Sequence, residues 1–277
     1  MNRHGGADWV TTEHPAHAVH LAANAGLEGY DTVVALGGDG TVHEVINGLM
    51  RVGAAQRPSL GVVPVGSGND FAYGASVPTD SAESIERIFT GKPKAIDVAV
   101  ARDDHDRIEY WNNTLGIGFD AKVNIMSRTI RGLHGFPMYL VAVFRTLLQD
   151  HEPANLTLRF DDGPAIEHSV SMLTLGNGPR EGGGFRTTPA ARVDDGSLDF
   201  MMISHVSRIT MLSLIPKLTN GTHGASRHVT LGSFRRLRLR ADRALPIHAD
   251  GELWSAYEAN TRELEVEIVP GAIQLLV

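Results

Sequence analysis

A glycine-rich stretch with a single carboxylate is the part of this sequence best suited to chemistry. The sequence GGDG (37–40) lies between the apolar run TVVAL (32–36) and a segment whose apolar residues have helical spacing. Glycine lets backbone N–H groups approach an anion closely, and such groups at a helix N-terminus bind phosphate. A carboxylate there would repel phosphate, so Asp39 fits best with a Mg²⁺ ion between them. The loop therefore predicts a nucleotide site.

A second loop repeats this pattern after the next apolar run. LGVVPV (60–65) is followed by Gly-Ser-Gly (66–68) and then by Asn69 and Asp70, which are typical of a helix start. Two such loops after parallel strands would lie at the same edge of a sheet. Neither loop has the Walker or dinucleotide-binding spacing. The structural alternative is a pair of tight turns, with Glu44 serving only in a capping box that begins at Thr41.

Composition excludes several classes of protein. The chain has 277 residues, no cysteine and a net charge of −7, so thiolate metal sites are excluded and nucleic-acid binding is not expected. No run approaches the ~20 apolar residues of a membrane span, and no signal peptide begins the chain. These features predict a cytoplasmic protein.

The order of elements predicts two domains. Strand and helix signals alternate through the first hundred residues, including a short strand at DWVTT (8–12), which predicts a doubly wound parallel sheet. Beyond that, short alternating strands dominate, with helical signals at 121–131, 136–149 and 207–219. We therefore expect an α/β domain at 1–98 and a strand-rich domain at 99–277, whose last residues could pack back on the first. The cleft between them is the expected ligand site.

Five blocks of this sequence resemble the diacylglycerol kinase family. They are GGDGTVHEVINGL, VPVGSGNDFA, NNTLGIGFDAKV, NGPREGGGFRTTPAARVDDGSLD and HADGE, in that order. The resemblance is to the bacterial soluble lipid kinases, relatives of sphingosine and ceramide kinases, and the first loop is shared with NAD kinases. It implies an N-terminal ATP domain, a C-terminal β-sandwich domain and an active site between them.

The resemblance also implies roles for individual residues. Glu252 and Asp250 of the second domain would be catalytic, together with Asp39. A magnesium site would be formed by Asp195 with the carbonyl groups of Arg192 and Ser197. The ATP-binding set would comprise Thr12 (or Thr11), Gly37, Gly38, Asp39, Gly40, Thr41, Val42, His43 and Ser67. His43 stands where the family frequently has asparagine.

The expected activity is phosphorylation of a lipid hydroxyl by ATP with Mg²⁺, giving phosphatidic acid from diacylglycerol. The lipid lies at a membrane surface, so peripheral membrane association is expected, and a homodimer is possible in this family. The family normally opens with a further β-α unit and an Asn-Pro-x-Ser-Gly loop, and this sequence begins after that point. Another acceptor, such as a sphingoid lipid or a metabolite, is one alternative. A nucleotide- or lipid-binding protein without catalysis is the other, if that unit is missing.

Two further patterns have a structural and a functional interpretation. RRLRLR (235–240) alternates arginine with leucine, as in a strand with one solvated face, but could also contact anionic headgroups. GLHGFPMYLVAVFRTLL (132–148) is strongly apolar and predicts either a core helix or a wall for acyl chains.

Overall fold

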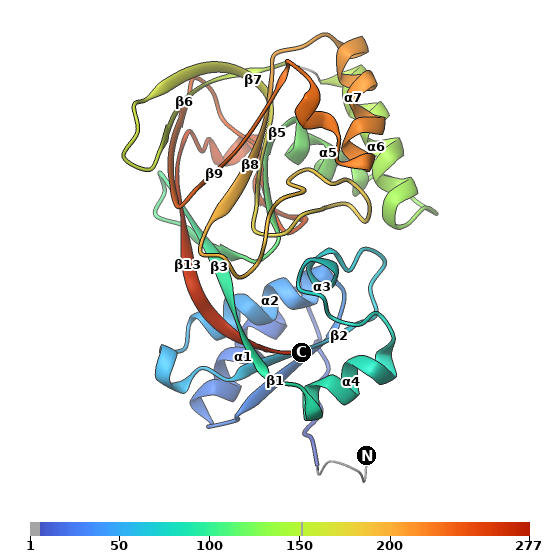
Figure 1. Cartoon of the computed structure of the whole chain (residues 1–277), viewed down its shortest axis with the longest axis vertical. Coiled ribbons are helices and arrows are strands. Elements are labelled where there is room, and N and C mark those ends of the chain that lie inside the picture. Colours follow the sequence, from blue (N-terminus) through green and yellow to red (C-terminus); the bar gives the residue numbers. More distant parts are fainter. Residues whose placement is uncertain (1–5, 151) are drawn as a thin grey trace.

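The computed structural model describes residues 6–150 and 152–277, which form two lobes joined by two long strands (Figure 1). The long strands β3 (Pro93–Asp103) and β13 (Glu263–Leu276) run through both lobes. The smaller lobe contains α1 (His17–Leu27), β1 (Thr32–Gly37), α2 (Asp39–Met50), the short helix η1 (Ala54–Gln56), β2 (Ser59–Pro64), α3 (Asp70–Gly74) and α4 (Ser81–Thr90).

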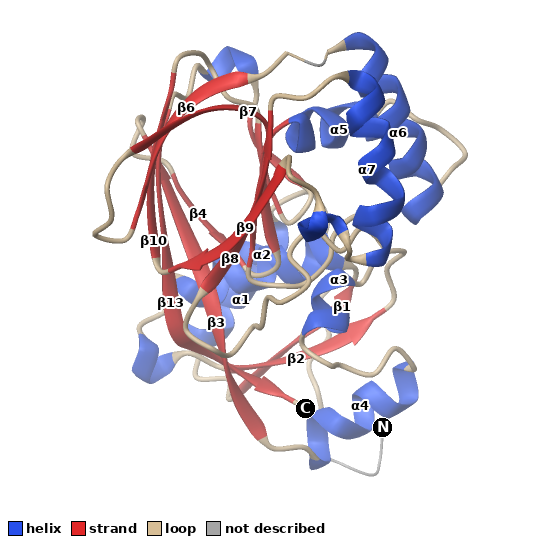
Figure 2. Ribbon diagram, turned by 45° about the horizontal axis from the view of Figure 1, so that its top comes forward, coloured by secondary structure: helices blue, strands red, loops and turns tan. Residues whose placement is uncertain are grey.

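The larger lobe is a curled sheet with helices on one side (Figure 2). Its helices are α5 (Phe119–Ser127), α6 (Gly135–Gln149) and α7 (Arg208–Asn220), with the short helices η2 (His223–Ala225) and η3 (Tyr257–Ala259). Its strands are β4 (Ile108–Trp111), β5 (Thr114–Gly118), β6 (Ala154–Phe160), β7 (Ile166–Gly176), β8 (Leu198–Ser204), β9 (Val229–Phe234), β10 (Arg236–Ala241), β11 (Ile247–Ala249) and β12 (Glu252–Ser255).

Parallel pairing in the smaller lobe places both glycine loops at one edge. β1 and β2 pair in parallel over their whole length, from Thr32 opposite Ser59 to Gly37 opposite Pro64. Each strand therefore ends at the same level, and each is followed by a helix, α2 or α3. The apolar stripe of α2 is buried against this sheet, with Ile46 fully covered. The alternating pattern thus gives the expected α/β fold.

Two expectations for strands are corrected. Residues 8–12 form no strand and are exposed, because no neighbouring strand offers them hydrogen bonds in the described structure. β3 does not extend the parallel sheet but pairs antiparallel with β13, from Leu264 opposite Asp103 to Leu276 opposite Pro93. β13 is a single strand with an irregularity between Val269 and Ile273.

The end of the chain is part of the smaller lobe. β13 begins in the larger sheet, where it pairs with β10, and ends beside β2, with Leu275 parallel to Leu60. Both of these leucines are fully buried in the core of the smaller lobe. The irregularity in β13 is held by buried Asp97, which accepts the backbone N–H groups of Gly271 and Gly196 at 2.8 and 2.7 Å. The lobes are thus joined by continuous strands and not by a flexible linker.

Helices α5, α6 and α7 pack together on one side of β7 and β8 and form a separate apolar core. Ala142 and Leu147 of α6 are buried in it, as are Met211 and Leu214 of α7. Residues 135–149 are therefore a packed helix, although one of its faces remains exposed. No helix among the described residues has both the length and the apolar character needed to cross a bilayer.

The arginine-leucine strand is β10, and its arginines are paired. Leu237 and Leu239 point into the core, while each arginine of β10 lies directly opposite a glutamate of β13. The pairs are Arg236–Glu267, Arg238–Glu265 and Arg240–Glu263, at 2.6, 3.0 and 3.5 Å. This arrangement supports the solvated-face interpretation, because the positive charges are balanced within the sheet.

Candidate active site between the lobes

A cavity of about 350 Å³ lies between the two lobes and brings the predicted loops together. Gly38, Asp39 and Gly40 of the first loop line it, and so do Gly66, Ser67 and Gly68 of the second. The turn at 250–252, from the larger lobe, lines the same cavity. Much of its remaining wall is apolar and comes from α5, α6 and α7, while charged side chains such as Glu181 and His248 line it as well. One end of the cavity is therefore formed by glycine backbone and the other by side chains of the helical layer.

The two glycine loops touch each other directly. A Cβ atom added to Gly66 would clash with the Cα atom of Gly38, and one added to Gly38 would lie 3.1 Å from the Cα atom of Gly66. Asn69 closes the second loop by accepting from the N–H of Gly66 at 3.0 Å and donating to its carbonyl at 2.9 Å. A side chain at position 66 would therefore separate the loops, and one at position 38 would leave a tight contact between them.

Asp39 joins the first loop to the helix after the second loop. Its Oδ1 atom accepts the backbone N–H of Phe71 in α3 at 3.1 Å, so this carboxylate caps α3. Burial raises the pKa of Asp39, and the nearby charge of Asp250 raises it further. A cation beside Asp39 would relieve both effects. The donor chemistry fits Mg²⁺, which prefers carboxylate oxygens.

Asp70 ties the second loop to the larger lobe. It accepts from Arg180 Nε at 2.7 Å and from the backbone N–H of Gly183 at 2.9 Å. Burial raises its pKa to about 6, with the charge of Asp39 as the next cause. A Cβ atom added to Gly68 would lie 2.9 Å from Oδ2 of Asp39 and 3.4 Å from Oδ2 of Asp70. Two carboxylates thus share one small region beside the loops.

Asp250 is a fully bonded carboxylate. Its Oδ1 atom accepts the backbone N–H groups of Asn113 and Thr114 at 2.8 and 3.0 Å. Its Oδ2 atom accepts the N–H of Asn112 at 2.9 Å and lies 2.8 Å from Nδ1 of His43. All of its acceptor positions are therefore used by the protein. This arrangement suits a group that holds the turn in place better than a group that takes up a proton.

His43 links α2 to the larger lobe. Its buried ring lies between Asp250 and Glu109, with Nε2 3.0 Å from Glu109 Oε1. Burial lowers the pKa of His43, but hydrogen bonds to the two carboxylates outweigh burial and raise it to about 10. The side chain is not part of the cavity wall. The imidazolium therefore holds the turn at Asp250 in place. It does not line the cavity, although the family resemblance implied that His43 contacts ATP.

Glu252 reaches across the cavity toward the first loop. Its Oε1 atom lies 3.2 Å from the point where a Cβ of Gly40 would stand. Its Oε2 atom forms an ion pair with Arg128 of α5 at 2.9 Å. The side chain is exposed, so unlike Asp250 it retains room for a ligand.

Several predicted site residues lie outside the cavity wall. Thr12 and Thr11 are exposed in the segment before α1. Gly37, Thr41 and Val42 flank the first loop without lining the cavity, although the side chain of Thr41 packs against Gly37. Glu44 accepts the backbone N–H groups of Ala16 and Ala18. It therefore caps α1 and not its own helix, because α2 already begins at Asp39.

The predicted magnesium turn is also separate from the cavity. Arg192, Asp195 and Ser197 lie in the loop before β8, and none of them lines the cavity. Asp195 is exposed and its Oδ1 accepts the N–H of Ser197 at 3.0 Å, which is the pattern of a simple turn. The structure does not bring these residues to the glycine loops.

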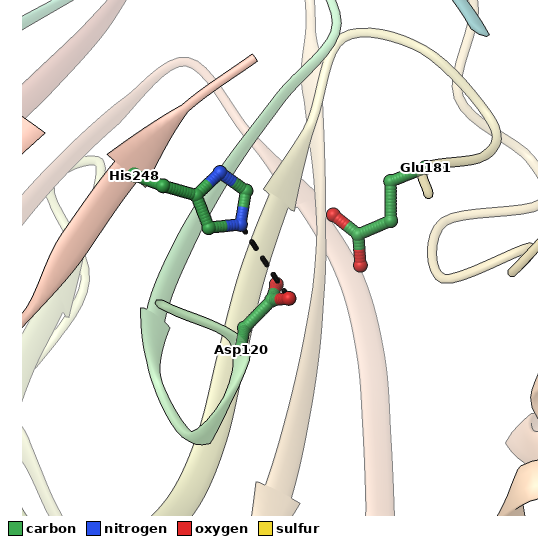
Figure 3. Close-up of side chains that lie close together, drawn as sticks. All are labelled: Asp120, Glu181 and His248. Atoms are coloured by element: carbon green, nitrogen blue, oxygen red, sulfur yellow. Dashed lines mark ion pairs between the residues drawn. The ribbon is translucent and has the colours of Figure 1, made fainter. Parts of the chain in front are cut away.

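Three buried side chains of the cavity wall were not singled out from the sequence (Figure 3). Asp120 lies in the first turn of α5, Glu181 lies in the loop after β7, and His248 is on β11. Each belongs to one of the sequence blocks quoted above, and a search of those blocks for charged residues would have found them. Their carboxylate and imidazole groups face one another.

Comparisons with known proteins show the family of this chain. Residues 1–101 match the diacylglycerol kinase catalytic domain, and residues 113–277 match the YegS C-terminal NAD kinase beta sandwich-like domain. A protein of Chromohalobacter salexigens named "Probable lipid kinase YegS-like" is 33% identical over 93% of this chain and 79% of its own length. A diacylglycerol kinase of Mycobacterium tuberculosis is 31% identical over 99% of this chain and 86% of its own length.

A solved structure shows the same fold. The crystal structure of a diacylglycerol kinase from Bacillus anthracis has a TM-score of 0.69 and 21% identity. The match covers 96% of this chain and 83% of the other.

Proposed function

This chain belongs to the diacylglycerol kinase family of lipid kinases, and from that premise we propose that it transfers the γ-phosphoryl group of ATP to the hydroxyl of diacylglycerol, giving phosphatidic acid. One observation carries the proposal. A single cavity is lined by the two glycine loops, by Glu252 close to Gly40, and by apolar side chains of the helical layer. A triphosphate, a reacting hydroxyl and an acyl chain need these three kinds of surface in one cavity.

The glycine loops are the site for the triphosphate. With no side chain at Gly38, Gly40 or Gly66, backbone N–H groups at the start of α2 are open to phosphate oxygens. Asp39 would hold a Mg²⁺ ion beside the phosphates, and Asp70 stands next to it. That ion would neutralise the negative charge that develops on the transferred group. The chain itself fixes the position of the phosphates through the contact between the loops.

Glu252 is the proposed group for the acceptor hydroxyl. It faces Gly40 across the cavity, and its ion pair with Arg128 holds it in that direction. From there it can orient the hydroxyl and take its proton as the oxygen attacks the phosphorus. Asp250 positions this turn through its backbone hydrogen bonds, since its own oxygens are occupied.

The apolar wall is the proposed site for an acyl chain. Phe119 and Val123 of α5, Val143 of α6, and Met211 and Ile215 of α7 form part of it. An apolar chamber beside a phosphate loop favours an amphipathic alcohol over a polar metabolite, because a polar acceptor would leave this surface in water.

Exposed apolar side chains on the same helices support contact with a membrane. Phe144 and Leu148 of α6 are 46% and 74% exposed, and Ile209 of α7 is 80% exposed. Helices α6 and α7 lie side by side in both views of the molecule. We propose that this face enters the membrane interface, so that the lipid passes into the chamber between the helices.

The test is phosphoryl transfer from labelled ATP by the purified chain to diacylglycerol in mixed micelles, with sphingosine and glycerol as competing acceptors. Labelled phosphatidic acid is the expected product. Glu252→Gln should lower the rate by about 10²–10⁴-fold, the usual range for a catalytic acid or base. Glu258→Gln is the matched control, because Glu258 is also exposed, lies six residues further on and does not line the cavity.

Three results would contradict the proposal. They are a wild-type rate for Glu252→Gln, transfer to glycerol in preference to the lipid, and no transfer by the wild-type chain.

A further inference from the structure

We infer that Asp120, Glu181 and His248 form a binding site for one transition-metal dication such as Zn²⁺, separate from the magnesium of the nucleotide. The ligand atoms of these residues all lie within 4.8 Å of one another, and all three side chains are buried. Figure 3 shows the two carboxylates and the imidazole pointing into one space. This site would bind a metal whether or not the chain transfers phosphate, although its three residues line the same cavity.

The spacing between Asp120 and His248 fits a shared metal better than a hydrogen bond. His248 Nε2 and Asp120 Oδ1 are 3.4 Å apart, beyond the usual range for N–H···O hydrogen bonds. Two ligands that are each about 2.1 Å from a zinc ion at the tetrahedral angle are about 3.4 Å apart. The pair therefore already has the separation of one edge of a zinc site.

Glu181 provides an unsatisfied ligand. Its Oε2 atom is buried and has no hydrogen-bond partner. Burial raises the pKa of Glu181 well above its usual range, and the charge of Asp120 adds to this effect. Within residues 6–150 and 152–277, neither carboxylate is paired with a lysine or arginine. A dication would supply the missing positive charge, which the fold does not provide otherwise.

Neighbouring residues hold the cluster open and orient it. Thr174 Oγ1 donates to Oδ2 of Asp120 at 2.6 Å, which leaves Oδ1 for the metal, as is common for the outer partners of metal ligands. A Cβ atom added to Gly116 of β5 would clash with both Nε2 of His248 and Oδ2 of Asp120. Glycine at position 116 therefore provides the space in which the two side chains meet.

Binding through Nε2 has one local cost. It requires the ring proton to be on Nδ1. At present Nδ1 accepts the backbone N–H of Gly251 at 3.3 Å, and a proton on Nδ1 would end this contact. That contact is long for a hydrogen bond, and Gly251 lies in a turn with φ +83°. Metal binding replaces this one weak contact with a metal–nitrogen bond.

The ligand set selects the class of metal. One imidazole with two carboxylates is a mixed nitrogen and oxygen set, which suits zinc, whereas Mg²⁺ prefers oxygen ligands alone in an octahedron. Three protein ligands leave at least one position for water or a ligand oxygen. All three residues line the cavity, so that position is within reach of its contents.

The experiment is a calorimetric titration of the full chain, stripped with chelator and free of nucleotide and lipid, with ZnCl₂. We expect one equivalent to bind and a large excess of MgCl₂ not to displace it. Glu181→Gln and His248→Gln should each weaken binding by about 10–100-fold. His168→Gln is the control, because His168 is exposed on β7 outside the cavity, and it should bind as the wild type does.

A second measurement separates ligation from a general change in structure. Co²⁺ in the site should give visible absorption bands that differ between the wild type and His248→Gln, while circular dichroism of the two remains the same. Gly116→Ala should lower Zn²⁺ affinity without removing a ligand. The inference is overturned if the wild type takes up no Zn²⁺, if both ligand variants bind it unchanged, or if Mg²⁺ displaces it. If Glu181→Gln does not fold, His248→Gln decides the matter.

Discussion

The two ends of the cavity are built in opposite ways. The proposed nucleotide end consists of backbone, with glycines at 38, 40 and 66, and of two carboxylates, Asp39 and Asp70, that are hydrogen-bonded to neighbouring segments. The facing wall consists of buried side chains that come from distant segments, such as Asp120 and His248. In the proposed function the backbone end binds the phosphates that all nucleotides share, while the side-chain wall contacts the acceptor. Changes at the two ends should therefore have different consequences.

The largest effect is expected where the two loops touch. Gly66→Val should reduce ATP binding below detection, because a side chain there would push the second loop away from Gly38. Gly53→Ala is the matched control, since a Cβ atom at Gly53 meets nothing within 4 Å. Calorimetric titration with ATP and MgCl₂ measures both. Wild-type affinity in Gly66→Val would show that contact between the loops is not needed.

Asp39→Asn should have the next largest effect. The amide keeps the size of the side chain and loses the charge that would hold Mg²⁺, so phosphoryl transfer should fall on the order of 10²-fold. The variant should also lose the stimulation by added MgCl₂ that we expect of the wild type. Labelled-ATP assays over a range of MgCl₂ concentrations measure this. An unchanged rate and an unchanged magnesium dependence would remove Asp39 from the nucleotide end.

The ion pairs of His43 with Glu109 and Asp250, which join the two lobes, should affect the pH dependence of stability. The pKa of His43 is about 10 in the fold and ~6.5 in an unfolded chain. Because the folded pKa is the higher one, its contribution is complete below pH ~6.5 and is lost as the pH rises toward 10. His43→Asn should therefore flatten the decline in the free energy of unfolding between these pH values.

Urea denaturation at a series of pH values measures that slope. His168→Asn, at an exposed position on β7, should keep the wild-type slope. Equal slopes in the wild type and His43→Asn would mean that His43 is not charged between Asp250 and Glu109.

The smallest effect is expected on the outer face of α6. Phe144→Ser with Leu148→Ser removes exposed apolar side chains and should weaken binding to phosphatidylglycerol vesicles about 10-fold, with little change toward lipid in detergent micelles. Leu231→Ser, at a side chain of β9 that is 42% exposed, is the control. Vesicle co-sedimentation measures the difference. Equal binding of the double variant and the wild type would place the membrane contact elsewhere.

The sequence predicted the nucleotide end better than the facing wall, for a physical reason. A glycine loop is a local feature, because the strand, the loop and the helix follow one another in the chain. Asp39 and Ser67 could therefore be placed from their neighbours alone, and the contact of the loops followed from the parallel strands.

The facing wall depends on contacts between distant segments. Asp120, Glu181 and His248 meet only because β5, β7 and β11 are arranged around one space. Nor could the sequence show that the His43 side chain pairs with Glu109 and does not line the cavity. Family resemblance supplied Glu252, whereas the different environment of its neighbour Asp250 required the fold.

The most direct measurement is a crystal structure of this chain with a non-hydrolysable ATP analogue and Mg²⁺. We expect the triphosphate oxygens within hydrogen-bond distance of the backbone N–H groups at positions 38 and 40. The γ-phosphate should face Glu252 across the cavity. A triphosphate bound elsewhere, with the glycine loops in contact with solvent alone, would contradict the account.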